Sequence, residues 1–420
     1  MELKPGYKQT EVGVIPEDWE VSFLSSATLK IQDGTHFSPK LGGNDFLYIT
    51  SKNIRHGYID LSKVDRIDTE QHKAIYKRCD VKYGDLLLTK DGASTGNAAF
   101  NSMREEFSLL SSVALLRFDS NKHDANYFLQ QILSQAGQQR ISEAMSGNAI
   151  TRLTLDKIKK LVYPIPPTKT EQTAIANTLS DADALIQSLA SLIAKKRRIK
   201  QGAMQTLLNP YENGRLKEGW VMKKLGDCLD KIVGGGTPSR SVKSYWGKEI
   251  PWVTVKDFSS FSPFSTQEYI TTEGLKHSAT NIIPRGTIII ATRMALGRAV
   301  IYDVDVCINQ DLKAIFPKLD VCVLYLKHWL EKNASLIEEL GSGSTVMGVS
   351  LEDLRKIEFS MPSKENQTRI ATILSDIDAE IAALEAKLAK YQHIKQGMMQ
   401  NLLTGRIRLV KPDNNTGAAA

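Results

Sequence analysis

The feature that most constrains this chain is a long segment that occurs twice. Residues 171–208 and 366–403 align without a gap, and 21 of the 38 aligned pairs are identical. The similarity continues upstream after a slip of one residue, where LTLDKIKKLVYPIPP in the first copy matches VSLEDLRKIEFSMPS in the second. Repetition over such a length indicates that a whole structural unit has been duplicated.

Both copies carry the pattern of a long helix that pairs with another helix. Apolar or long-stemmed residues recur at alternating steps of four and three, and no proline interrupts them. In the first copy this stripe consists of Ile175, Leu179, Ala182, Ile186, Leu189, Ile193, Lys196, Lys200, Ala203 and Leu207. In the second copy it consists of Ile370, Leu374, Ile377, Ile381, Leu384, Leu388, Tyr391, Lys395, Met398 and Leu402.

The length of the repeat favours pairing of the two helices over local docking. A helix over 38 residues would be about 57 Å long at about 1.5 Å per residue. We therefore expect the two helices to pair with each other as a coiled-coil spacer. The architecture predicted for the chain has them antiparallel, with pseudo-twofold symmetry. The alternative is a pair of amphipathic helices that each dock on their own domain.

A glycine interrupts each predicted helix at the same place. Gly202 and Gly397 lie in the repeated phrases IKQGAMQTLL and IKQGMMQNLL. Glycine inside a helix costs about 1 kcal/mol relative to alanine. Its occurrence at both positions predicts a close backbone approach where the helices pair, so we include both glycines among the helix-pairing residues.

The helices divide the chain into five segments. We expect a globular domain over 1–155, a central region with the first long helix over 156–210, a second globular domain over 211–350, a distal region with the second helix over 351–408, and a disordered tail over 409–420. Strand-like runs alternate with polar loops in both globular segments, so the predicted fold class is α/β (α+β).

The bulk composition and the known catalytic motifs favour a binding protein over an enzyme. The net charge of +7 and the pI of about 9.0 permit nucleic-acid binding without requiring it. The sequence has no phosphate-binding loop, zinc-protease motif or nucleophile elbow, and its seven histidines are scattered. We predict no catalytic and no metal-binding residue. The four cysteines are expected to be reduced thiols.

Two further features suggest where the chain acts and how its parts join. No apolar run is long enough to cross a bilayer, and the first residues lack the order of a secretory signal, so we expect a cytoplasmic protein.

The glycine run at 234–236 is interpreted as a flexible loop. The proline run at 163–167 is interpreted as a rigid connector, because it lacks the Asn or Asp of an adenine methyltransferase motif.

Several phrases, taken in order, resemble a known family. The opening phrases IPEDWEV from Ile15 and LKEGWVMKKLGD from Leu216 occur in corresponding places. They are followed by GGGTPS, YWGKEIPWVTVKDF, TRMALGRAVI and INQDLKAI, and by EQTAIANTLSDADALI and NQTRIATILSDIDAEI at the helix starts. Together with the duplication, these phrases are similar to the specificity subunit (S, HsdS) of type I restriction–modification systems.

The resemblance implies a DNA-recognition subunit without catalysis of its own. Each globular segment would be a target recognition domain that reads one half of an asymmetric bipartite DNA site. Two modification subunits, which use S-adenosylmethionine, and restriction or translocation subunits, which use ATP and Mg, would assemble on it. This chain itself would hold no cofactor. The alternatives are a two-headed protein-interaction scaffold with a coiled-coil spacer and a self-contained nuclease or methyltransferase.

Polar residues in the predicted loops are the candidates for contact with DNA. Side chains that read base edges are polar, while Lys and Arg position the phosphates. The candidates in the first domain are Thr35, His36, Lys52, Asn53, Lys90, Ser94 and Asn97. Those in the second are Thr237, Ser239, Arg240, Lys243, Lys256, Asp257, Arg293 and Arg298.

Overall fold

The chain packs into two compact units, and neither is one continuous stretch of sequence. The computed structural model describes residue 3 and residues 5–145, 152–342 and 348–410, so most of the predicted tail lies outside the described residues. Unit 1 contains residues 1–189 and 387–420, and unit 2 contains residues 190–386. The units therefore divide both repeated segments near their middle. We call the globular parts before the first and second long helix head 1 and head 2.

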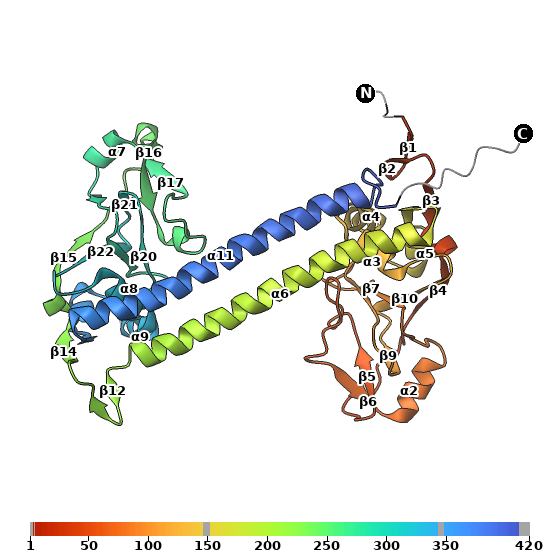
Figure 1. The fold of residues 1–420 in the computed structure, drawn as a ribbon, viewed down its shortest axis with the longest axis horizontal. Coiled ribbons are helices and arrows are strands. Elements are labelled where there is room, and N and C mark those ends of the chain that lie inside the picture. The colour runs from red at the N-terminus through yellow and green to blue at the C-terminus, as the bar shows by residue number, and fades with distance from the viewer. Residues whose placement is uncertain (1–2, 4, 146–151, 343–347, 411–420) are drawn as a thin grey trace, which may run out of the picture. The chain divides into compact units, whose positions relative to one another are not determined.

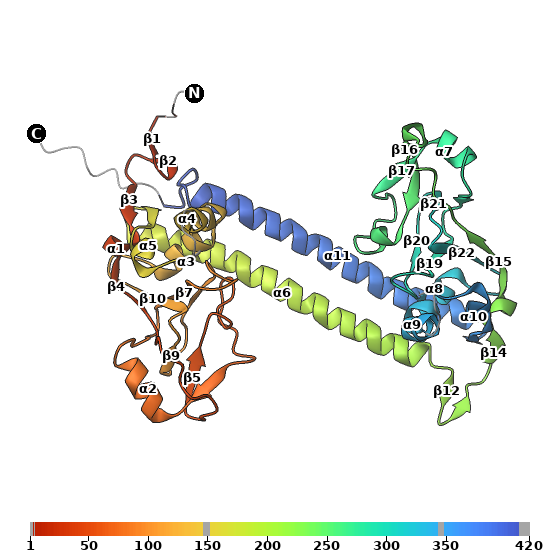
Figure 2. The same ribbon diagram turned by 180° about the vertical axis from the view of Figure 1, so that it is seen from behind.

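Two unbroken helices of 39 residues confirm the predicted long helices. They are α6, Lys169–Leu207, and α11, Lys364–Leu402. Each helix begins beside its own head and continues into the other unit (Figures 1 and 2). Each unit consequently contains the first part of one long helix and the last part of the other.

Head 1 is built on a four-stranded antiparallel sheet with the order β4-β10-β7-β8 and a three-stranded sheet with the order β6-β5-β9. Its strands are β1 Tyr7–Thr10, β2 Gly13–Pro16, β3 Glu20–Phe23, β4 Thr28–Asp33, β5 Phe46–Ile49, β6 Asp65–Ile67, β7 Leu86–Thr89, β8 Ala98–Phe100, β9 Phe107–Leu109, β10 Val113–Phe118 and β11 Val162–Ile165. Its helices are α1 Leu24–Ala27, α2 Thr69–Tyr76, α3 Ala125–Leu133, α4 Gln135–Met145 and α5 Leu155–Lys159.

Head 2 repeats this plan with sheets of order β15-β22-β19-β20 and β17-β16-β21-β18. Its strands are β12 Tyr211–Glu212, β13 Arg215–Leu216, β14 Val221–Lys224, β15 Leu229–Gly234, β16 Trp246–Val253, β17 Glu268–Ile270, β18 Ile282–Ile283, β19 Ile288–Ala291, β20 Ala299–Ile301, β21 Val306–Ile308, β22 Leu312–Pro317 and β23 Glu358–Met361. Its helices are α7 Thr272–Lys276, α8 Val323–Lys332, α9 Ala334–Ser342 and α10 Leu351–Lys356, with short 3-10 turns at Leu225–Cys228, Lys243–Tyr245 and Val255–Phe258.

The strand pairing shows that the two heads share one topology. β5 pairs in parallel with β9, and β16 pairs in parallel with β21. The strand before each long helix, β11 or β23, pairs antiparallel with the strand at the start of its head, β3 or β14. The prediction of a duplicated mixed α/β fold is confirmed at the level of individual strands.

The glycine run of head 2 lies against backbone and does not form a merely flexible loop, so that interpretation is wrong. A Cβ built on Gly235 would lie 2.0 Å from the carbonyl oxygen of Ile308. Gly34 in head 1 meets the carbonyl oxygen of Leu109 at the same distance. Only glycine allows the loop after β4 or β15 to approach the neighbouring strand end so closely.

Each unit has a core that joins a head to both long helices. In unit 1, the buried side chains of Trp19 and Leu179 share a cluster with Leu402 and Leu403 from the end of α11. In unit 2, Trp220 shares a cluster with residues of α8, β23 and the start of α11, and Leu208 joins it from the end of α6. The tryptophan phrases that open the two heads thus mark equivalent core positions.

A buried glutamine in the second turn of each long helix ties that helix to its head. The Gln367 Oε1 accepts a hydrogen bond from the backbone N–H of Cys322 at 2.7 Å, and its Nε2 donates to the carbonyls of Asp320 and Pro362. Gln172 makes the equivalent three bonds in unit 1, with Asp124, Lys122 and Pro166. Gln172 and Gln367 are each 1% exposed. The repeated phrase at the start of each long helix therefore holds that helix against its head.

Ion pairs inside each unit show that the helices run antiparallel. In unit 2, Lys196 pairs with Glu380 at 2.7 Å and Lys200 pairs with Asp378 at 2.6 Å. In unit 1, Lys395 pairs with Asp183 at 2.6 Å, which is the repeat of the Lys200 pair. Residue numbers fall along α11 as they rise along α6. All twenty positions of the predicted stripes are buried or half-buried.

The explanation proposed for the two helix glycines is wrong. A Cβ built on Gly202 or Gly397 would meet no atom of the surroundings within 4 Å. No close backbone approach within the described part of the chain therefore requires glycine at either position. The helices pair through the apolar stripe and the flanking ion pairs, and the two glycines lie beside this contact without contributing a side chain to it.

No helix among the described residues is both long enough and apolar enough to cross a membrane. The long helices α6 and α11 have the length, but charged side chains recur throughout both of them.

Candidate nucleic-acid interface

One buried carboxylate in head 1 contacts two of the candidates and lies near a third. Asp33, at the end of β4, is 3% exposed. Its carboxylate lies 3.2 Å from the His36 ring, 3.4 Å from the Lys90 ammonium and 3.2 Å from the Arg78 guanidinium. Thr35, the third candidate in this group, is buried beside them, and its backbone N–H bonds to Leu109.

The side chains of this group differ in whether they are free to contact DNA. Lys90 is 5% exposed and also pairs with Asp91 at 3.1 Å, which in turn binds Arg152. A lysine enclosed by two carboxylates cannot reach a phosphate without breaking these pairs. The side chains of His36 and Arg78 are 54% and 52% exposed, so they can meet DNA from this position.

The remaining candidates in head 1 lie around a cavity of about 780 Å³ between two loops. Lys52, Asn53 and Ser94 line this cavity, while Asn97 donates a hydrogen bond to the carbonyl of Ile54 close by. The Asn53 side chain accepts from Thr50 and donates to two carbonyls of its own loop, so its hydrogen-bonding capacity is already used. Lys52 is exposed at the rim.

In head 2, the segment INQD, residues 308–311, contacts two of the loops that carry candidates. The Thr237 hydroxyl bonds to the Gln310 side chain at 2.5 Å. On the other side, the Arg293 guanidinium lies 3.8 Å from the Asp311 carboxylate. Thr237 and Arg293 are both exposed, so the structure brings them to one surface beside the Gln310 amide.

A second candidate group in head 2 is built around a cation–π contact. The Arg240 guanidinium carbon lies 3.8 Å from the centroid of the Trp246 ring. Two hydrogen bonds from the guanidinium to the Glu268 carboxylate hold it over the Trp246 ring. The carbonyl of Ser239 accepts a bond from the Trp246 ring nitrogen. Arg240 is thus a fixed, exposed cation whose charge is partly neutralised by Glu268.

The other candidates in head 2 divide into exposed cations and one buried acid. Lys243, Lys256 and Arg298 are exposed. Asp257 is 3% exposed, and its carboxylate accepts bonds from the N–H of Thr254 and of Gln267. The bond from Thr254 belongs to a capping box at the start of a 3-10 turn, and the bond from Gln267 ties a second segment to that turn. The buried Asp257 therefore orders its loop.

The sequence patterns do not point to three further side chains beside the candidates, namely Arg78 in head 1 and Gln310 and Glu268 in head 2. Arg78 follows α2, far in sequence from Asp33, so no local pattern connects the two. Gln310 could have been found, because INQD directly follows a buried strand and a polar residue at such a strand end often contacts a ligand.

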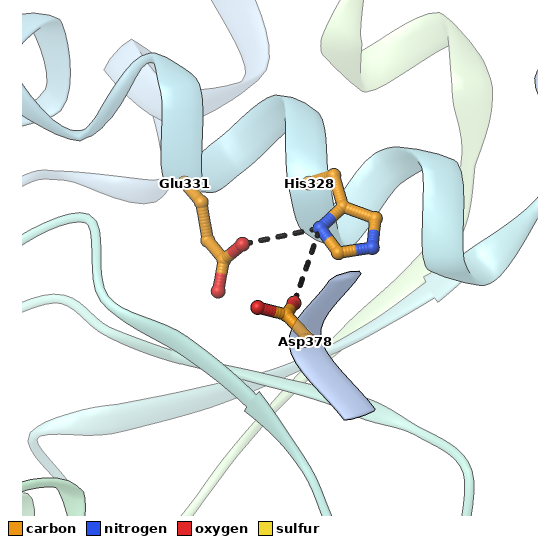
Figure 3. A group of neighbouring side chains, drawn as sticks. All are labelled: His328, Glu331 and Asp378. Carbon is orange, nitrogen blue, oxygen red and sulfur yellow. Dashed lines mark hydrogen bonds and ion pairs between the residues drawn. The ribbon is translucent and has the colours of Figure 1, made fainter. Parts of the chain in front are cut away.

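One His/Glu/Asp cluster among the described residues has the spacing of a metal site. It consists of His328, Glu331 and Asp378 in unit 2 (Figure 3). The Glu331 carboxylate lies 2.7 Å from the Lys327 ammonium, and Asp378 lies 2.6 Å from that of Lys200. Because two ammonium groups already neutralise the carboxylates, the cluster is an ion-pair network that joins α6, α8 and α11.

The buried thiols are unsuited to nucleophilic chemistry. All four cysteines are free. Burial raises the pKa of the Cys79 thiol to about 12 and that of Cys307 to about 11. A thiol with such a pKa is protonated at neutral pH and does not act as a nucleophile.

Comparison with known proteins places this architecture in one family. The sequence matches the model of the type I restriction modification DNA specificity domain twice, over residues 16–195 and 217–395. A putative type I restriction enzyme MjaX specificity subunit of Methanocaldococcus jannaschii is 27% identical over 421 residues, which cover 96% of this chain and 97% of that protein. The EcoR124I/EcoR124II specificity subunit of Escherichia coli is 29% identical over 57% of this chain and 60% of its own length.

Solved structures share the fold at low sequence identity. The crystal structure of the type I restriction–modification S subunit from M. genitalium has a TM-score of 0.65 and 17% identity, covering 96% of this chain and 98% of that chain. A chain from a study of complex assembly and conformational transition of the type I R-M system has a TM-score of 0.56, covering 94% of this chain and 99% of that chain. These similarities support the fold of both units.

Proposed function

This chain belongs to the type I restriction–modification DNA specificity family, and from that premise we propose that its two heads read the two different halves of a bipartite DNA site. Members of the family recognise DNA sequence and do not catalyse a reaction themselves. They bind DNA and act in complexes with methylase and restriction subunits. The alternative of a protein-interaction scaffold has no support from these relationships.

The observation that carries the proposal is the contrast between a shared plan of strand pairing and different loop chemistry. Both heads place a loop after β4 or β15 against the end of the neighbouring strand, through Gly34 or Gly235. The next residues differ, because head 1 presents His36 beside a buried Asp33, while head 2 presents Thr237 beside Gln310. Different donors and acceptors on one scaffold select different base edges. An asymmetric site is the consequence that we propose.

Exposed cations near these loops provide the contacts to phosphate. In head 1 these are Lys52 and Arg78, with the exposed His36 ring nearby; in head 2 they are Lys243, Lys256, Arg293 and Arg298. Phosphate contacts position the protein on the duplex, and base contacts then select the sequence. We propose that Thr35, Asn53, Lys90 and Asp257 act only by holding the loops that carry these groups.

The partners and cofactors follow from the same proposal. We propose that two modification subunits, one for each repeated unit, bring S-adenosylmethionine to adenines in the two half-sites. Restriction subunits would bring ATP and Mg. The duplicated architecture supports a stoichiometry of two, because each unit offers the same arrangement of head and paired helices. Since its substrate would be cellular DNA, we propose that the complex works in the cytoplasm.

An exchange of head 2 tests the proposal. Residues 217–350 would be replaced by the corresponding segment of another specificity subunit, and the chain would be combined with its modification subunits. Methylated positions would then be mapped by sequencing. We expect one half of the methylated site to change and the other half to stay the same. A change in both halves, or methylation of a contiguous palindrome, would contradict the proposal.

A further inference from the structure

The hairpin loop between β19 and β20 holds two side chains in a strained backbone conformation. Met294 has a φ of 49° and Ala295 a φ of 47°. Among the described residues, Asn213 is the one other non-glycine residue with a positive φ. Two consecutive positive φ values are typical of tight hairpin turns, where Asn-Gly is the usual pair. Methionine and alanine adopt this conformation only at an energetic cost.

Anchors on both sides keep this loop from relaxing. The N–H of Arg298 bonds to the carbonyl of Ala295 at 3.2 Å, and the N–H of Thr292 bonds to the carbonyl of Asp311 at 2.9 Å. A Cβ built on Gly297 would lie 2.7 Å from the Cα of Ala334, and Leu296 packs against the core of unit 2. The surroundings therefore determine where the tip of the loop lies.

The anchored tip presents one apolar side chain between two cations. Met294 is 68% exposed. The Arg293 side chain is 55% exposed, and Arg298 is also exposed. Arg293 faces Asp311 in the INQD loop, which places Met294 next to the surface that carries Thr237 and Gln310.

The corresponding loop of head 1, between β7 and β8, is one residue longer and has a glycine at the matching distance from its strand end. Thr89 and Ala291 occupy equivalent strand ends, because each pairs with the first residue of its central strand. Three residues further on, head 1 has Gly92, with a φ of 96°, where head 2 has Met294. Glycine adopts this conformation without strain. Counted from equivalent strand ends, head 2 therefore has an exposed side chain where head 1 has a glycine.

We propose that Met294 is a specificity-determining residue, which makes an apolar contact with the C5-methyl group of a thymine in the half-site read by head 2. The inference rests on the proposed DNA-reading function. The thymine methyl is the apolar group on the base edges of the major groove. Methionine offers an unbranched, polarisable side chain that adapts to such a group. The flanking arginines can contact phosphates on either side, so the strained loop directs the thioether at the bases.

The test uses the full chain assembled with its modification subunits. The variants are Met294→Ala and Met294→Gly, and the control is Leu319→Ala in the turn after β22, where Leu319 is 99% exposed. The kcat/KM for methylation is measured on the cognate duplex and on duplexes in which each thymine of either half-site is replaced by deoxyuridine. Glycine adopts a positive φ without strain, so we expect Met294→Gly to fold, and a thermal unfolding measurement of this variant checks that expectation.

The expected result is a specific coupling between one side chain and one methyl group. Removing the relevant methyl should reduce kcat/KM of the natural chain about fourfold, as expected for one buried carbon. Both Met294 variants should lose at least as much on the thymine substrate and should no longer distinguish uracil from thymine there. The Leu319→Ala chain should show the same thymine-to-uracil ratio of kcat/KM as the natural chain. For each thymine of the other half-site, this ratio should be the same in the Met294 variants as in the natural chain.

Several outcomes would overturn the inference while leaving the proposed function intact. One is a half-site for head 2 that contains no thymine. Another is an unchanged thymine-to-uracil ratio of kcat/KM in both Met294 variants. If these variants also bend DNA less than the natural chain, Met294 acts as a wedge between base steps. Failure of the natural complex to methylate any bipartite site would instead refute the proposed function.

Discussion

Replacing Gln367 by alanine should destabilise unit 2 by about 3 kcal/mol, because one buried amide holds three backbone groups. The bond from Gln367 to the Pro362 carbonyl is buried, while those with Asp320 and Cys322 are partly buried. Assigning about 1.5 kcal/mol to the buried contact and about half as much to each of the others gives this loss. For a unit of this size, the midpoint of thermal unfolding should fall by about 6–12 °C.

The assay is chemical denaturation combined with hydrogen exchange. Denaturation gives the free energy of unfolding, and exchange shows which amides lose protection. We expect the loss in α8, β23 and the first turns of α11, which meet at Gln367. The matched control is Gln201→Ala, because Gln201 is exposed on α6, and its effect should be within about 0.5 kcal/mol.

The repeat provides an internal comparison. Gln172→Ala should produce a similar loss in unit 1, with exchange increasing around α3 and the start of α6. A loss below about 0.5 kcal/mol for Gln367→Ala would refute the reasoning, because it would mean that the amide bonds contribute no more than an exposed side chain. Increased exchange of equal size in both units would also refute it.

Three further perturbations follow from the structure. Gly202→Ala and Gly397→Ala should each stabilise the free chain by about 1 kcal/mol in denaturation, because the added methyl meets no atom and alanine favours the helix; a loss of stability would show an unrecognised contact. Glu331→Gln should flatten the acid dependence of stability. Burial opposes ionisation of this carboxyl, but the bond from His328 and the charges of the lysines outweigh it and lower the pKa from 4.5 to about 2. The folded state binds fewer protons than the unfolded state between these values, so stability should fall as pH drops through this window, and the variant should show a smaller fall in pH-dependent denaturation. Arg293→Ala should weaken DNA binding and reduce the slope of log affinity against log salt by about one in a titration, since it removes one phosphate contact; an unchanged slope would argue against this contact.

The long helices could be predicted because their signal is local and repeated. A stripe held over ten positions in each copy leaves few alternatives, and residues such as Ile175 and Leu374 are fully buried as the pattern requires. The reason for the glycines could not be predicted in this way. What surrounds Gly202 depends on the shape of the facing helix and heads, and the sequence of one helix contains no information about that space.

The polar loops could be located from sequence, but the direction of their side chains could not. Asn53 and Lys90 have the chemistry of DNA contacts, yet both are occupied by partners within head 1. Asp33, which holds Lys90, lies on a different strand and more than fifty residues away. Whether a polar loop residue faces solvent or its own protein is decided by such distant partners, which single-sequence patterns do not identify.

The composition of unit 1 has a consequence for how the protein is made. Its core contains Leu179 and Leu402, and Arg408 bonds to the carboxylates of Asp18 and Glu171. At a synthesis rate of about 5–20 residues per second, the roughly 220 residues between these leucines take about 10–45 s to emerge. Head 1 must remain incomplete on the ribosome for that time, with part of its apolar surface exposed, whereas unit 2 can close earlier. The part of the chain that is synthesised first is therefore the last to become native, and a truncation near the C-terminus should damage the opposite end of the sequence.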